Sequence, residues 1–149
     1  MMLLSCKVRI YPGHMVTRAF SLTTARVLHI IANEKSISLF RAIFQSGNGI
    51  NTESLNDKTK LTRKEYYTRL SGMVKAGLVM KTDGRYTLTT FGNVVYSSQM
   101  MVENGITNFW KLKAIDSLSM TKELPKEEQQ KVADKLLLNN QEIKEIIRK

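Results

Sequence analysis

Apolar and polar residues recur with the period of a helix along much of the first half of the chain. Between residues 23 and 33, a threonine that can cap a helix precedes apolar positions at helical spacing. Residues 36–45 carry enough apolar side chains to face a core, and the Ser-Gly-Asn-Gly segment at 46–49 ends that helix. A short, mostly polar helix is expected over residues 53–59, as a surface element that leans on its neighbours. The pattern up to this point predicts three helices, with room for a very short strand at Ile50.

A capping box marks the start of the next helix. The Thr62 hydroxyl can accept a hydrogen bond from the Glu65 amide, and the Glu65 carboxylate can accept one from the Thr62 amide, so a helix begins there. It is expected to reach Ala76 and to end at Gly77, because glycine suits the left-handed position after a helix. At about 100° per residue, its apolar side chains cluster on one face. The expected core residues on that face are Tyr66, Leu70, Met73 and Val74.

A β-hairpin is predicted directly after this helix. Residues 78–82 and 85–88 are separated by Asp83-Gly84, and an Asp-Gly pair supplies the positive φ values that a two-residue turn requires. The remainder of the chain predicts four further helices, at about residues 90–105, 108–118, 125–137 and 139–147. The expected fold class is therefore mainly α with a small β-hairpin, an α+β arrangement.

The balance of charge points to a polyanionic partner. The 149 residues include 23 Lys and Arg against 13 Asp and Glu, which gives a net charge of +10 and an isoelectric point near 9.8. Nucleic acid is the first candidate and an anionic membrane surface is the second. Residues 58–85 alone hold eight basic and two acidic residues, a net charge of +6. A folded segment of this kind can hold its charges against phosphates in fixed register.

No residue pattern predicts catalysis, a metal or a cofactor. His14 and His29 are isolated, and His29 lies in an apolar helix, where a core histidine is expected. Gly47 and Gly49 lack the Lys-Ser or Lys-Thr pair of a phosphate-binding loop. Cys6 is the single cysteine, so no internal disulfide can form, which favours a cytoplasmic protein. With no catalytic pattern we expect a protein that is not an enzyme. No apolar run approaches the length of about 18 residues that a membrane span needs, so we also expect no membrane partner.

The order helix, short helix, tight turn, capped helix and hairpin is that of a winged helix-turn-helix unit. Two segments are especially specific for such a unit: Ala-Gly-Leu-Val at residues 76–79, where the capped helix ends, and the Tyr-x-Leu-Thr-x-x-Gly pattern at residues 86–92, where the hairpin ends. Over about residues 30–104 the chain resembles prokaryotic winged-helix transcriptional regulators, closest in pattern to the ArsR and MarR type and to small archaeal regulators with this domain. The resemblance implies a winged helix-turn-helix with additional N- and C-terminal helices. No cysteine follows Cys6, so a thiolate metal sensor of that type is not expected.

The resemblance also implies which residues meet DNA. In such regulators the third helix enters the major groove, and the hairpin, or wing, contacts the backbone or the minor groove. On this chain the recognition helix covers about residues 62–76 and the wing about residues 79–88. The residues placed in the groove are nearly those that the helical wheel leaves exposed, namely Arg63, Lys64, Tyr67, Thr68 and Ser71. The expected phosphate contacts are Lys58, Lys60, Lys81 and Arg85.

These observations divide the chain into an N-terminal extension (1–22), a DNA-binding domain (23–104) and a C-terminal helical region (105–149). The last region is nearly charge-balanced and apolar on one face, so we expect it to join two copies into a homodimer that reads a palindromic operator. The predicted function is that of a cytoplasmic, sequence-specific regulator of transcription that binds double-stranded DNA. The sequence also admits an architectural or replication-associated winged helix of low specificity, and a protein-interaction module of a transcription complex. It leaves any small-molecule effector open.

Overall fold

The computed structural model describes residues 22–148, so Cys6, His14 and the expected N-terminal extension up to residue 21 lie outside the described part of the chain. The elements, in chain order, are α1 (Thr24–Ile31), α2 (Glu34–Gln45), β1 (Ile50–Asn51), α3 (Thr52–Thr59), α4 (Arg63–Lys75), β2 (Val79–Thr82), β3 (Arg85–Leu88), α5 (Thr90–Thr107), α6 (Phe109–Met120), α7 (Lys126–Leu136) and α8 (Gln141–Ile147). The described residues are mainly helical and carry one small sheet, which confirms the expected α+β class.

The sheet consists of three antiparallel strands in the order β1-β3-β2. β2 and β3 form the predicted hairpin, in which Val79 pairs with Leu88. The short strand β1 adds to the other side of β3 through the pair Ile50 and Tyr86. Because Ile50, Val79 and Tyr86 are all buried, the sheet attaches the hairpin firmly to the helices.

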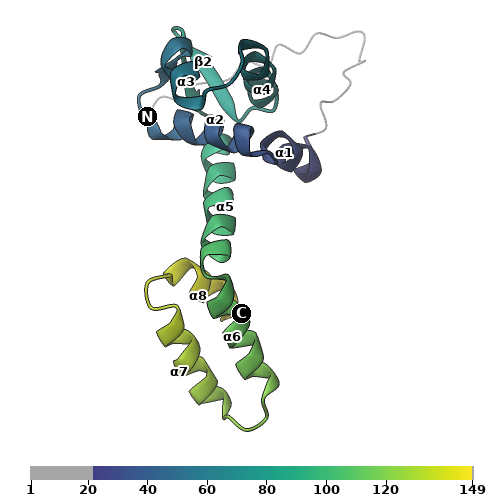
Figure 1. The fold of residues 1–149 in the computed structure, drawn as a ribbon, viewed down its shortest axis with the longest axis vertical. Coiled ribbons are helices and arrows are strands. Elements are labelled where there is room, and N and C mark those ends of the chain that lie inside the picture. The colour runs from purple at the N-terminus through teal and green to yellow at the C-terminus, as the bar shows by residue number, and fades with distance from the viewer. Residues whose placement is uncertain (1–21, 149) are drawn as a thin grey trace, which may run out of the picture.

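Helices α1 to α4 and the sheet gather at one end of the molecule, and α5 leads away from them to α6, α7 and α8 at the other end (Figure 1). The start of α5 joins the first end through Tyr96, whose ring stacks on Phe44 with the ring centroids 4.0 Å apart. The main core lies at this end, and its largest fully buried side chains include Tyr66, Phe40, Leu39, Ile43, Leu55, Met73 and Leu78. At the other end, the buried apolar residues among those described are Ala133, Leu137 and Ile143.

A threonine and a glycine form the junction between the hairpin and α5. Thr89 caps the helix: its hydroxyl accepts a hydrogen bond from the Gly92 amide and donates one to the Gly77 carbonyl oxygen. The backbone of Gly92 lies so close to Leu78 that a Cβ at position 92 would stand 2.0 Å from the Leu78 carbonyl oxygen. Only glycine allows α5 to begin this close to the hairpin, which explains the Tyr-x-Leu-Thr-x-x-Gly pattern in physical terms.

Two residues expected in the core lie elsewhere. Val74 is 39% exposed, because the buried arc of α4 is narrower than the helical wheel suggested and does not reach this position. His29 is exposed as well. Helix α1 buries only the edge that carries Val27 and Ile31, and a residue two positions from each of them points away from that edge.

Several helix boundaries also differ from the expected ones, among them those of α2, α5 and α7. Helix α2 begins at Glu34, two residues before the expected start, because the Asn33 side chain accepts hydrogen bonds from two amides of its first turn. Helix α5 continues through Gly105, which has no positive φ and so does not end the helix, and α5 therefore crosses the domain boundary expected after residue 104. Pro125 directly precedes α7 rather than forming its first residue.

Candidate nucleic-acid interface

Helix α4 begins with the predicted capping box. The Thr62 hydroxyl accepts from the Glu65 amide at 3.3 Å, and a Glu65 carboxylate oxygen accepts from the Thr62 amide at 3.2 Å. The other carboxylate oxygen pairs with Lys35 Nζ at 2.6 Å, which ties α4 to the first turn of α2. The Lys35 ammonium and the Thr62 donors lower the pKa of Glu65 from its usual 4.5 to about 2. Glu65, the single carboxylate of α4, therefore pairs with Lys35 and does not pair with the cations on the exposed side of the helix.

The inner face of α4 holds the helix on the core. Tyr66, Leu70 and Met73 are at most 2% exposed. Arg69 also turns inward, and its Nη1 donates a hydrogen bond to Ser36 Oγ of α2 at 2.9 Å. One of the eight basic residues in the segment 58–85 therefore serves the packing of two helices rather than the outer surface.

A tight turn sets the angle between α3 and α4. Lys60 follows α3 in the left-handed conformation, with φ of 49°, and the next residue, Leu61, is buried. Leu55, the one large apolar side chain of α3, has no exposed surface and anchors this otherwise polar helix. The turn thereby fixes Lys58 and Lys60, both exposed, beside the start of α4.

The outer face of α4 carries the residues that the sequence assigns to the major groove. Tyr67, a residue on the border of the helical wheel, is 46% exposed, and the Arg63 guanidinium lies 5.9 Å from the centre of its ring. Side chains at these spacings lie along one flank of a helix. All members of the set are exposed together on this flank: Arg63, Lys64, Tyr67, Thr68 and Ser71.

The hairpin carries two further cations next to α4. Its turn is the predicted one, with φ of 50° at Asp83 and 75° at Gly84. Lys81 lies on β2 with its ammonium 5.4 Å from the centre of the Tyr86 ring, and Arg85 begins β3. Both cationic side chains are exposed, and β2 packs beside α4, so the hairpin extends the charged surface of that helix.

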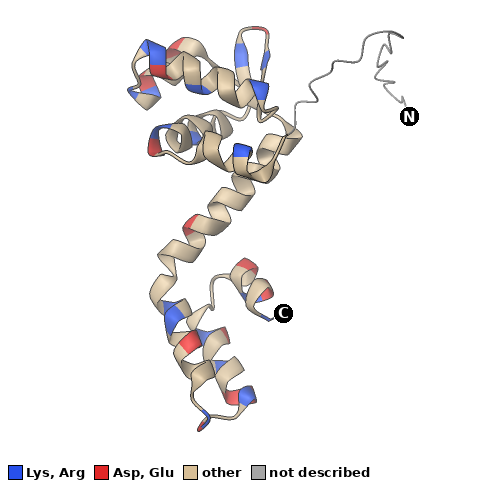
Figure 2. Ribbon diagram, turned by 90° about the vertical axis from the view of Figure 1, so that its right-hand side faces the viewer, with Lys and Arg blue, Asp and Glu red and all other residues tan. Residues whose placement is uncertain are grey.

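Together these elements form one cationic surface at one end of the molecule. Figure 2 shows Lys and Arg at the end that holds the hairpin, with some Asp and Glu among them, and both signs of charge on the helices at the far end. Lys75, the last residue of α4 and one of the eight basic residues counted in the sequence, is exposed and extends this surface toward the hairpin. The exposed cations of this surface, none of which forms an ion pair with another described residue, are Lys58, Lys60, Arg63, Lys64, Lys75, Lys81 and Arg85.

Residues 22–148 contain neither a metal-binding cluster nor a membrane-spanning helix. No three His, Cys, Asp or Glu side chains of this part of the chain come together as a metal site would require. None of its helices has the length and hydropathy to cross a bilayer. Comparison of the chain with protein-family models, with curated proteins and with solved structures finds no match. What the protein does is therefore inferred from the cationic surface.

Proposed function

We propose that the protein is a sequence-specific transcriptional regulator that binds double-stranded DNA through a winged helix-turn-helix. In this proposal α2, α3 and α4 form the helical unit, α4 is the recognition helix, and the β2–β3 hairpin is the wing. The observation that carries it is the outer flank of α4, where polar and cationic side chains stand exposed on a capped helix whose opposite face is buried. A helix held in this way can keep hydrogen-bonding groups in register with base edges.

The side chains on this flank suit the edges of bases in the major groove. Arg63 and Lys64 can donate hydrogen bonds to O6 and N7 of guanine. The hydroxyls of Thr68 and Ser71 can bond either to bases or to phosphates, and the Tyr67 ring can pack on a thymine methyl group. The set therefore combines groups that discriminate between base pairs with groups that hold the helix in place.

The surrounding cations supply affinity without sequence preference. Lys58 approaches the DNA backbone from the last turn of α3 and Lys60 from the turn before α4, while Lys81 and Arg85 approach it from the wing. Each phosphate that such a side chain neutralises releases counterions, so the binding constant falls with added salt by a slope of about 0.9 per contact. Steep dependence on salt is thus a direct consequence of this surface.

We further propose that two copies act together in the cytoplasm on an inverted repeat. The two recognition helices of a homodimer would then lie about 34–36 Å apart, one turn of DNA. The apolar side chains that α5 and α6 expose beyond Tyr96, among them Val102 and Trp110, support a second copy.

Selection of bound sequences from a random duplex pool tests the proposal. We expect an enriched inverted repeat, and fluorescence anisotropy should show binding to that repeat about 10³-fold tighter than to random duplex at physiological salt. Equal affinity for all duplexes, with a steep salt slope, would instead favour an architectural DNA-binding protein. Weak binding without a steep salt slope would favour a protein-interaction module, and either result overturns the assignment as a sequence-specific regulator.

A further inference from the structure

Helix α4 is attached to α2 along one edge by two polar contacts. Lys35 Nζ pairs with the Glu65 carboxylate at 2.6 Å. One turn further along α4, Arg69 Nη1 donates a hydrogen bond to Ser36 Oγ at 2.9 Å. Glu65 and Arg69 are four residues apart and therefore lie on the same edge of α4. Their partners are neighbours in the first turn of α2, so the two contacts act side by side.

The two contacts differ in their surroundings. The Lys35 and Glu65 side chains are 54% and 33% exposed, so water and salt screen their attraction. Ser36 is only 2% exposed, and Nε of Arg69 is enclosed as well. A hydrogen bond that is shielded from water is stronger than one in solvent. The Arg69–Ser36 bond is therefore the firmer of the two contacts at physiological salt.

This bond is an expensive way to pack two helices. Arg69 is the one basic residue of the segment 58–85 that is not exposed. Its guanidinium forms no ion pair with a described carboxylate, and its enclosed Nε finds no acceptor among the described residues. A partly buried cation without a counter-charge costs free energy, whereas an apolar side chain of similar length would fill the space without that cost. Arg69 therefore contributes more to the geometry of the two helices than to their stability.

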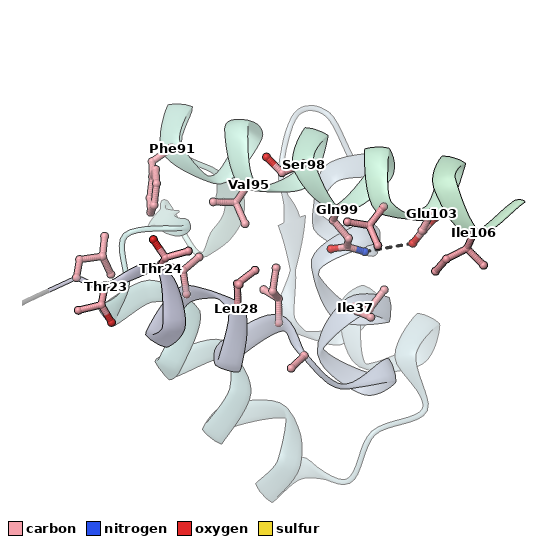
Figure 3. A pocket seen from close by; sticks show the side chains of 15 residues that line it. Thr23, Thr24, Leu28, Ile37, Phe91, Val95, Ser98, Gln99, Glu103 and Ile106 are labelled. Atoms are coloured by element: carbon pink, nitrogen blue, oxygen red, sulfur yellow. Dashed lines mark hydrogen bonds between the residues drawn. The ribbon is translucent and has the colours of Figure 1, made fainter. Parts of the chain in front are cut away.

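Helix α2 is itself held in place by α5. The Phe44 ring stacks on Tyr96. The Arg41 guanidinium pairs with the Glu103 carboxylate of α5. Figure 3 shows Glu103 with its hydrogen bond from Gln99, in the wall of the groove of about 730 Å³ between α1 and α5. Helix α2 is thus fixed by contacts that do not involve α4, and it gives that helix a rigid base.

A small rotation of α4 about its own axis would displace its outer side chains. The buried residues Tyr66, Leu70 and Met73 hold α4 on the core through hydrophobic burial, which has no preferred direction. At a radius of about 5–6 Å, side chains included, a rotation of about 15° moves the end of a side chain by about 1.4 Å. Hydrogen bonds to base edges tolerate only about 0.5 Å. A directional contact that prevents such a rotation therefore decides whether Lys64 and Thr68 can meet base edges.

We propose that Arg69 is a positioning residue for DNA recognition. Its hydrogen bond to Ser36 fixes the rotation of α4 on α2, and that rotation sets which base edges Lys64 and Thr68 reach. Arg69 does not touch the DNA. This inference rests on the proposed function and adds to it a residue that acts on the sequence preference only through the position of α4.

Two substitutions remove the bond from opposite sides. Arg69→Met keeps the length and the apolar packing of the side chain, whereas Ser36→Ala removes the acceptor and leaves the charge of Arg69 in place. Each should lower the preference for the selected site over random duplex roughly 10-fold, since one well-placed base contact discriminates by about this much. The double variant should lose no more than either single one, because both remove the same bond. Fluorescence anisotropy with the two duplexes measures these losses.

The salt dependence of binding to random duplex separates positioning from direct contact. Arg69→Met should leave the slope unchanged, whereas loss of a phosphate contact would lower it by about 0.9. The matched control is Lys135→Met, which removes the same charge from an exposed position of α7 and should change neither the slope nor the preference. The proposal is overturned by a lowered slope in Arg69→Met, by additive losses in the double variant, by an unchanged preference in both single variants, or by an equal loss in the control.

A measurement without DNA tests the bond in the wild-type chain. The Nε–H group of Arg69 should give an NMR signal that exchanges with water more slowly than that of the exposed Arg63, and Ser36→Ala should speed this exchange. Exchange as fast as that of Arg63 overturns the proposal whether or not the variants fold. Ser36→Ala removes a single oxygen atom, so it provides the binding test by itself if Arg69→Met does not fold.

Failure of this inference is distinguishable from failure of the proposed function. A wild-type chain that binds all duplexes equally refutes the function as a sequence-specific regulator, and with it the role of Arg69. A wild-type preference that survives in both single variants refutes the role of Arg69 alone.

Discussion

The two ends of the molecule expose different kinds of surface, one cationic and one apolar. At the first end, α2, α3, α4 and the sheet bury almost the whole main core and turn cations outward. Past Tyr96, the chain buries few apolar side chains and turns several outward, among them Trp110 at 79% and Met120 at 83% exposed. The first end holds most of the buried core and leaves cations without ion-pair partners, whereas the second end buries few apolar side chains and is nearly charge-balanced.

This difference indicates which kind of partner can bind each end. Cations without ion-pair partners on a rigid helix are matched by a polyanion, whose phosphates supply the missing charge. Apolar side chains on a neutral helix are matched by another apolar surface, whose burial yields roughly 25 cal/mol for each Å² removed from water. The binding of DNA and the pairing of copies are thus proposed for separate surfaces, and each can be disrupted without the other.

The largest expected effect comes from the outer flank of α4. Lys64→Ala combined with Thr68→Ala should remove at least roughly 100-fold of the preference for the selected site over random duplex, because both side chains are placed against base edges. Anisotropy titrations with the two duplexes measure it. The matched control is Lys111→Ala with Thr107→Ala at the far end, where both residues are exposed. If the preference survives in the α4 variant, α4 is not the recognition helix.

The junction between hairpin and α5 should give the next largest effect, this time on stability. Gly92→Ala places a Cβ 2.0 Å from the Leu78 carbonyl oxygen, a backbone atom that cannot move aside easily. We expect a loss of about 2 kcal/mol in the free energy of unfolding, measured in urea. Gly72→Ala in α4 is the control, since nothing lies within 4 Å of its Cβ, and it should stabilise the helix by up to about 1 kcal/mol. Equal effects of the two variants would contradict the close contact.

The wing should affect affinity without affecting specificity. Lys81→Ala with Arg85→Ala is expected to weaken binding to all duplexes alike and to lower the slope of log affinity against log salt by at most about two units. Binding measured from low to moderate salt gives the slope. An unchanged slope would remove the hairpin from the contact surface.

The smallest expected effect concerns acid stability at the start of α4. The pKa of Glu65 is lowered to about 2 in the folded chain, against 4.5 as its usual value. A carboxylate with a lowered pKa contributes stability above pH 4.5 and loses that contribution as the pH falls toward 2. Glu65→Gln should therefore lower the melting temperature slightly at neutral pH, because the exposed pair with Lys35 contributes little, and this difference from the wild type should vanish as the pH falls toward 2. Identical acid profiles for wild type and variant would contradict the role of this ion pair.

The sequence predicted well what depends on neighbouring residues. The Thr62–Glu65 capping box and the Asp83-Gly84 turn both follow from residues within one turn of each other, and the structure confirms both. The exposed flank of α4 was also recognisable, because a helix with a defined start leaves little choice about which residues share a face. This is why all five expected groove residues are exposed.

Other features depend on contacts between distant parts of the chain. The pairing of Ile50 with Tyr86, the inward turn of Arg69 onto Ser36 and the exposure of Val74 each result from how far one element covers another, which no local pattern encodes. The groove between α1 and α5 belongs to the same class. The stretch from residue 86 to residue 110, in which Glu103 is the only charged residue, was visible in the sequence, but only the structure shows that its part beyond Tyr96 leaves apolar side chains exposed.

Amide chemical shifts recorded while the selected duplex is added test the central claim most directly, because they report where on the protein the DNA lies. The largest changes are expected at residues 63–71 of α4 and at residues 81–85 of the hairpin, with α6, α7 and α8 unaffected. Changes concentrated in the far helices, with the amides of Lys64, Thr68 and Ser71 unmoved, would contradict it.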